Sequence, residues 1–241
     1  MSLIINYIYI CEDLRLLRHL RSKIHIFLFV LLSIPLSGQT TDWDKRLADM
    51  GFVDISTLDS SIQVHLVYAT SENFMNRPVY DGITKAWLHS DAARKLLQAQ
   101  QNLKREHPGY SLLVYDAARP IEVQSQMWEI VRGTRYIYYV ANPSNLNGRH
   151  NYGMAVDVTI VDGEGQPLQM GTPFDFFGEE AHTDKEETLV KSGKITEEDY
   201  HNRRLLRSIM QQAGFTPITS EWWHFNACTA EVAKAKYKVI Q

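Results

Sequence analysis

The sequence predicts an α+β fold in which one domain is built from an antiparallel sheet flanked by helices. Segments with strand and helix periodicity are mixed along the chain, without the regular β-α-β order that produces a parallel sheet. The 241 residues are enough for one domain with a substantial core, and no segment repeats at a fixed period. A composition of 44% hydrophobic and 22% charged residues is that of an ordinary globular protein. The net charge of -3 gives no electrostatic reason to expect nucleic acid or an anionic membrane surface as a partner.

Residues 1–38 have the layout of a secretory signal peptide. An apolar run over 24–34 is followed by small residues over 35–38. The basic residues before the run are Arg15, Arg18, Arg21 and Lys23. Because the run is shorter than the ~20 apolar residues that a bilayer span needs, we expect no stable membrane span. We therefore expect cleavage, a mature domain over 39–241 and a periplasmic or secreted location. The alternative is an amphipathic N-terminal helix of the folded domain.

The first half of this domain predicts one strand, one loop and one helix. Apolar and polar residues alternate over 62–66, which indicates a half-buried strand. Asparagine and proline over 71–80 indicate a loop. Ser90 is a suitable N-cap for a helix over 91–106, which Pro108-Gly109 would end.

The second half predicts two strands and two helices. A short apolar strand over 112–115 is followed by a helix over 120–132 that starts at proline, and then by a long loop over 133–149. A strand over 153–161 directs Asp157 away from its apolar face. The last helix follows Thr196, with Asp199 three residues on as an approximate capping box, and ends at Gly214.

Two short segments contain the residue types that zinc chemistry needs. The first runs from Gly148 to Asp157 and contains His150; the second is Ser220-Glu221-Trp-Trp-His224-Phe225. Together they offer two imidazoles and two carboxylates, a set that zinc accepts in catalytic sites that keep one position open for water. Each residue alone has an ordinary reading: a core histidine, a solvated aspartate or a strand end with aromatic packing.

The two segments, taken together, resemble the signatures of the D-alanyl-D-alanine dipeptidase family. The first is similar to Ser-x-His-x-x-Gly-x-Ala-x-Asp, and the second to Glu-x-x-His in its Glu-Trp-Trp-His form. Further matches stand in family order, so that the resemblance runs from about residue 55 to 226. They are Tyr68-Ala-Thr, Asn73-Phe74, Arg119-Pro120 and Met170-Gly-Thr-Pro-Phe174-Asp175.

The resemblance implies a fold like that of D,D-peptidases and hedgehog signalling domains, one zinc ion per chain and a dipeptide substrate. It implies hydrolysis of D-alanyl-D-alanine to D-alanine, and the predicted leader then favours a role in cell-wall peptide turnover or in nutrient recovery. The implied zinc ligands are His150, Asp157 and His224. The implied catalytic residues are Glu221, as the general base, and Arg119, beside the oxyanion. Asp175 would bind the substrate ammonium group. A structural arginine and a solvated loop aspartate are the alternatives at 119 and 175.

Gly148 departs from the family pattern, which has serine there, so a hydroxyl group is missing beside the predicted site. Two other functions stay open: a D,D- or L,D-carboxypeptidase acting on peptidoglycan peptides, and a non-catalytic zinc-bearing binding domain. We expect His182 not to be a ligand. Cys11 would leave with the leader, and Cys228 then stands alone as a small core residue.

Overall fold

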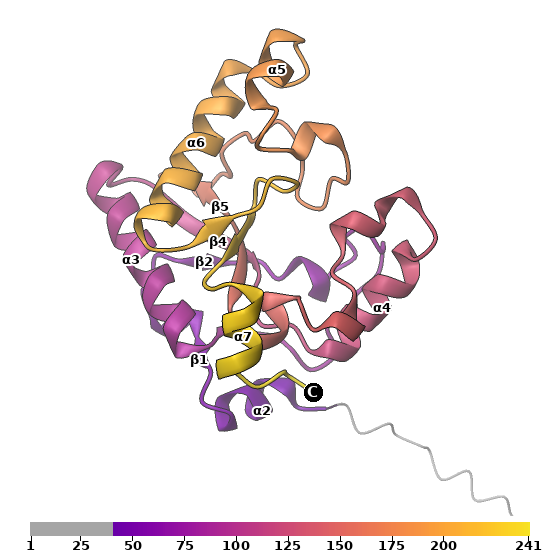
Figure 1. The fold of residues 1–241 in the computed structure, drawn as a ribbon. Coiled ribbons are helices and arrows are strands. Elements are labelled where there is room, and N and C mark those ends of the chain that lie inside the picture. The colour runs from indigo at the N-terminus through magenta and orange to yellow at the C-terminus, as the bar shows by residue number, and fades with distance from the viewer. Residues whose placement is uncertain (1–40) are drawn as a thin grey trace, which may run out of the picture. The chain divides into compact units, whose positions relative to one another are not determined.

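The computed structural model describes residues 41–241, so the predicted signal peptide lies outside the described residues. Its main sheet has the strand order β2-β4-β5-β7-β6 (Figure 1). The strands are β2 (Gln63–Val64), β4 (Ser111–Asp116), β5 (Ala155–Val161), β6 (Thr216–Pro217) and β7 (His224–Asn226). A separate antiparallel pair joins β1 (Val53–Asp54) to β3 (Trp87–Leu88).

Helices flank the sheet, as the α+β prediction requires. They are α2 (Trp43–Asp49), α3 (Ser90–Glu106), α4 (Ile121–Val131), α5 (Glu186–Lys191), α6 (Glu197–Gln212) and α7 (Ala230–Lys236). In Figure 1 the strands lie between α3 on the left and α4 on the right. α3 packs against both α6 and β4, and its buried stripe includes Ala92, Leu96 and Leu103. Across residues 41–241 we find no helix that is both long and apolar enough to cross a bilayer.

The helix ends agree with the predictions at α6 and differ at α3. The Thr196 hydroxyl accepts from the Asp199 amide at 3.0 Å and the Asp199 carboxylate accepts from the Thr196 amide at 2.8 Å, which completes the capping box. The prediction that Ser90 caps α3 is wrong, because His89 caps it through Nδ1. The His89 amide is bound to the Gly153 carbonyl at 3.0 Å, so the chain is still extended there and Ser90 is the first helical residue.

The strands differ from prediction in length and in one direction. β2 is two residues long and pairs parallel with β4, whereas the other ladders of the main sheet are antiparallel as predicted. Val64 is 37% exposed because β2 is an edge strand, while Ile62 and Leu66 on either side are buried. β5 is buried along its whole length because it is the central strand, so the side that holds Asp157 is enclosed by protein.

Two predicted boundaries near the site shift slightly. Pro120 is the N-cap of α4 rather than its first residue. The predicted loop over 133–149 contains short 3₁₀ turns at Arg135–Tyr139 and Pro143–Asn145, and a third follows at Arg149–Tyr152. This last turn leads directly into β5 and carries His150.

Candidate active site

Two strands and one turn bring His150, Asp157 and His224 together; we call these three residues the ligand triad. Asp157 on β5 and His224 on β7 are direct partners in the antiparallel ladder, so their side chains start from adjacent backbones. His150 reaches them because the chain reverses at Gly153, whose φ of +62° is left-handed. A Cβ at Gly153 would also lie 2.3 Å from a ring carbon of Phe52, so glycine is required there for space as well.

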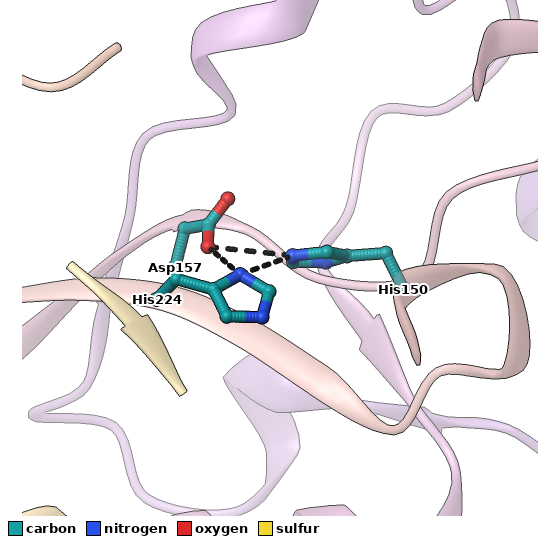
Figure 2. Close-up of side chains that lie close together, drawn as sticks. All are labelled: His150, Asp157 and His224. Carbon is teal, nitrogen blue, oxygen red and sulfur yellow. Dashed lines mark hydrogen bonds and ion pairs between the residues drawn. The ribbon is translucent and has the colours of Figure 1, made fainter. Parts of the chain in front are cut away.

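The inner atoms of the ligand triad are spaced like the corners of one face of a metal coordination tetrahedron (Figure 2). His224 Nδ1 lies 2.9 Å from Asp157 Oδ1 and 3.2 Å from His150 Nε2, and His150 Nε2 lies 3.3 Å from Asp157 Oδ1. Ligands held 2.0–2.2 Å from zinc in a tetrahedron are ~3.3–3.6 Å apart, slightly farther than these atoms. All three side chains are buried. Figure 2 shows that they point toward one another.

The outer contacts of the two histidines leave a lone pair pointing inward on each ring. His150 Nδ1 donates to the Ala117 carbonyl at 2.6 Å, so its Nε2 is unprotonated in the neutral ring. His224 Nε2 lies 3.0 Å from Asn226 Oδ1, which is identified as oxygen because Arg149 Nε donates to it at 2.7 Å. His224 Nε2 is therefore the donor, and Nδ1 faces inward unprotonated. Such outer hydrogen bonds orient metal-binding histidines.

Three atoms with free electron pairs therefore converge in a buried space, which suits the binding of a cation. In the metal-free protein burial raises the pKa of Asp157, but the charges and hydrogen bonds that His150 and His224 offer when protonated outweigh burial and hold its pKa below the usual range. A metal ion would take the place of those protons. An ionised carboxylate and two neutral imidazoles suit a divalent transition metal. The ligand triad can hold a metal ion.

Glu221 lies beside the ligand triad in the wall of a cavity of about 180 Å³. Its side chain is buried, and within residues 41–241 no hydrogen bond or ion pair engages its carboxylate. Burial raises the pKa of Glu221 to about 8, against the opposing influence of His224. A carboxylate that is unpaired and desolvated near a metal position can exchange protons with a bound molecule.

Arg119 forms another part of the cavity wall, and its guanidinium group is held from two sides. Nε donates to Asp116 Oδ2 at 3.0 Å, a terminal nitrogen donates to the same oxygen, and Nη1 donates to Gln124 Oε1 at 2.8 Å. The group also lies 5.0 Å from the ring centre of Tyr68. Three of its five N–H groups are thereby used, and Nη2 lies 3.8 Å from Asp157 Oδ2. The other two N–H groups can face a ligand.

Asp175 lines the same cavity from a loop and has an unusual backbone conformation. Its φ of +59° is left-handed, which aspartate tolerates better than most residues. Its carboxylate accepts from the Tyr68 hydroxyl at 2.8 Å and from the Phe74 amide at 3.3 Å. Burial raises the pKa of Asp175 to about 7. The Asp175 backbone is thus held in a strained conformation that places its acidic side chain at the cavity wall.

Comparison of the sequence with known proteins matches the chain to one family. Residues 48–241 match the family model described as D-ala-D-ala dipeptidase. The chain is 32% identical over 173 residues to the D-alanyl-D-alanine dipeptidase of Escherichia coli, covering 72% of this chain and 82% of that protein. It is 28% identical over 198 residues to the D-alanyl-D-alanine dipeptidase of Enterococcus faecium, covering 73% and 91%. The chain belongs to the D-Ala-D-Ala dipeptidase family. It is therefore a metallopeptidase, and the resemblance and the mixed α+β fold predicted from the sequence are confirmed.

The structure unites all the site residues that the family resemblance indicated. His150, Asp157, His224, Glu221, Arg119 and Asp175 all line the one cavity, together with Gly148. Their individual roles stay predictions. His182 is outside the ligand triad, and its Nε2 instead lies 3.0 Å from the Tyr139 hydroxyl. Cys228 is half-buried at the edge of the core.

Sequence reasoning missed the residues that hold the site residues in place. They are Tyr68, Asp116, Gln124 and Asn226. Tyr68 lies in one of the segments that resemble the family, but the resemblance implies no role for it. The spacing of Asp116, three residues before Arg119, was an available signal for an ion pair, and Asn226 stands two residues after His224 on the same face of β7.

Proposed function

We propose that this protein is a zinc-dependent dipeptidase that hydrolyses D-alanyl-D-alanine to two molecules of D-alanine. The observation that carries the proposal is the converging ligand triad with the unpaired carboxylate of Glu221 beside it in one cavity. Relatives named D-alanyl-D-alanine dipeptidase support the choice of substrate. Two histidines and one carboxylate are a familiar zinc set in hydrolytic sites.

In this proposal His150, Asp157 and His224 hold zinc, which when bound lowers the pKa of its water to about 7. Glu221 accepts a proton from the attacking water and returns it to the amine of the departing D-alanine. The free N–H groups of Arg119 hydrogen-bond the oxygen on which negative charge develops. Asp116 and Gln124 keep that guanidinium group in position before substrate arrives.

The size and charge of the cavity favour a small zwitterion. A volume of about 180 Å³ is below the ~300–1,000 Å³ of sites for drug-sized ligands. The substrate ammonium group would pair with Asp175, which lies in the cavity wall beside Tyr68. A carboxypeptidase acting on longer peptides needs an open passage at this end, and a binding domain has no need of a general base.

We also propose that the protein acts outside the cytoplasm, in the periplasm or as a secreted protein, in turnover of cell-wall peptides. Residues 1–38 support this, because basic residues are followed by an apolar run and then by small residues, as in a signal peptide. N-terminal sequencing of protein recovered from an extracytoplasmic fraction tests it. A mature N-terminus near residue 39 is expected, and a cytoplasmic protein that starts at Met1 would contradict it.

The decisive assay uses the purified protein with zinc, on D-alanyl-D-alanine and on a longer peptide that ends in it. We expect hydrolysis of the dipeptide and little release of D-alanine from the longer peptide. Preference for the longer peptide would indicate the carboxypeptidase, and zinc binding without hydrolysis of either would indicate the binding domain.

Removing the metal should abolish activity. Because the triad supplies three ligands, a chelator should yield inactive protein, and zinc at one equivalent per chain should restore turnover. Metal content measured by mass spectrometry alongside activity checks this. His150→Ala should bind zinc far more weakly, whereas His182→Ala should retain it, since His182 is outside the triad. Full turnover after complete zinc removal would contradict the proposal.

Blocking the substrate amine should reveal the contact with Asp175. Acetylation removes a charge-assisted hydrogen bond of ~1.5–3 kcal/mol, so kcat/KM should favour the free dipeptide about ten- to hundredfold. Asp175→Asn should erode that preference without altering zinc content. Because the pKa of Asp175 is about 7, its carboxylate is protonated as pH falls below that value, so the preference should fade in acid. Equal kcat/KM values for both substrates in the wild type would favour the carboxypeptidase.

A further inference from the structure

Gly148 stands where the family signature has serine, and its backbone does not explain the glycine. Its φ of -69° and ψ of 113° are open to any residue. The reason is space: a Cβ at position 148 would lie 2.6 Å from Asn151 Oδ1, and its other neighbours are at ordinary contact distances. Gly148 therefore accommodates one particular group, the side-chain amide of Asn151.

The Asn151 amide cannot easily move aside. The residue is 1% exposed, and its Nδ2 donates to the Arg119 carbonyl at 2.9 Å. Its backbone is fixed on both sides, since its amide donates to the Gly148 carbonyl and its carbonyl accepts from the Ile240 amide. Rotating the side chain away from a new methyl group at 148 would break the bond to Arg119 and leave a buried carbonyl unpaired.

That bond is one of three that join the Arg119 segment to the turn carrying His150. The Arg119 amide donates to the His150 carbonyl at 3.0 Å, and His150 Nδ1 donates to the Ala117 carbonyl at 2.6 Å. Residues 117–120 form neither helix nor strand, so these bonds, with one from the Ala118 amide to the Trp87 carbonyl, hold the segment in place beside the metal ligand. Asn151 supplies the only one of the three that comes from a side chain outside the ligand triad.

We propose that Gly148 and Asn151 form a matched pair in which Asn151 is a positioning residue for Arg119, and Gly148 leaves the space that its amide needs. The pair connects the arginine to the metal-binding turn. Since the proposed role of Arg119 is to act on the transition state, the inference rests on the proposed function.

The test is a double-mutant cycle with Gly148→Ala and Asn151→Ala. Each single variant should lower kcat by about ten- to hundredfold with little change in KM, because a small displacement of a positioned group has that effect. Zinc content should not change. The double variant should be no worse than Asn151→Ala alone, within about twofold, because the added methyl group then has room. Losses that multiply in the double variant would overturn the pairing.

Gly109→Ala is the matched control, because its added Cβ would meet nothing closer than 3.9 Å. It should keep wild-type kcat and stability. If Asn151→Ala fails to fold, Asn151→Ser provides a less disruptive truncation for the same cycle. A phosphinate analogue of the dipeptide separates positioning from simple loss of structure: its affinity should fall in parallel with kcat while D-alanine binds unchanged. Equal weakening of both would overturn the positioning role.

Thermal unfolding distinguishes failure of this inference from failure of the proposed function. The clash predicts that Gly148→Ala lowers Tm in the wild type and not in Asn151→Ala, whatever reaction the protein catalyses. A wild type inactive on D-alanyl-D-alanine would therefore refute the proposed function and leave this coupling intact. Equal Tm losses in both backgrounds would refute the pairing even in an active enzyme.

Discussion

Glu221→Gln is expected to keep zinc and lose about 10²- to 10⁴-fold in kcat, the typical contribution of general acid–base catalysis. The amide has nearly the shape of the carboxyl group but cannot accept the proton of the attacking water. Because no hydrogen bond engages the carboxylate within residues 41–241, the substitution should break no existing hydrogen bond. Zinc stoichiometry and steady-state kinetics on the same sample check the expectation.

The stability of this variant separates a catalytic from a structural role. Burial raises the pKa of Glu221 to about 8, so its ionised form is disfavoured in the metal-free protein. A neutral amide avoids that desolvation, and Tm of the metal-free variant should equal or exceed that of the wild type. Glu164→Gln, at an exposed turn, is the control and should retain full activity. Near-normal turnover of Glu221→Gln would refute the assigned role.

The ligand triad could be predicted because local rules fix much of its geometry. The period of two along β5 sets Asp157 apart from the apolar residues next to it, and the family signatures give its two partners. The sequence did not reveal that Asp157 and His224 are directly opposite in the ladder, because register depends on pairing between segments 67 residues apart. The same limit explains β2, whose parallel pairing with β4 depends on the whole sheet.

The supporting contacts were harder to predict because their partners are distant or common in type. Tyr68 holds Asp175 across 107 residues, and nothing local to either residue indicates the other. His89 caps α3 instead of Ser90, and its amide is bound to the carbonyl of Gly153, a residue distant in sequence that ends the turn carrying His150. Gly148 departs visibly from the family signature. That the Asn151 amide fills the space which a side chain at position 148 would need can be seen only in the structure.

Arg119→Ala should lower kcat about 10²- to 10³-fold if the guanidinium group stabilises the developing oxyanion. KM should change less, since an interaction made mainly in the transition state affects kcat. The variant also strands Asp116, which is fully buried and otherwise paired with Arg119. Breaking a buried ion pair from one side costs about 3–5 kcal/mol, so lost activity alone would not separate catalysis from stability.

A second substitution separates the two contributions of Arg119. Asp116→Asn removes the stranded charge, so the double variant Arg119→Ala/Asp116→Asn should regain much of the lost Tm. Its kcat should stay low, because asparagine restores no donor to the oxyanion. Arg105→Ala, at the exposed end of α3, is the control and should match the wild type in both measurements. If the double variant instead recovered activity together with Tm, Arg119 would be a structural arginine whose purpose is to neutralise Asp116, and the oxyanion would have to be stabilised by the metal alone.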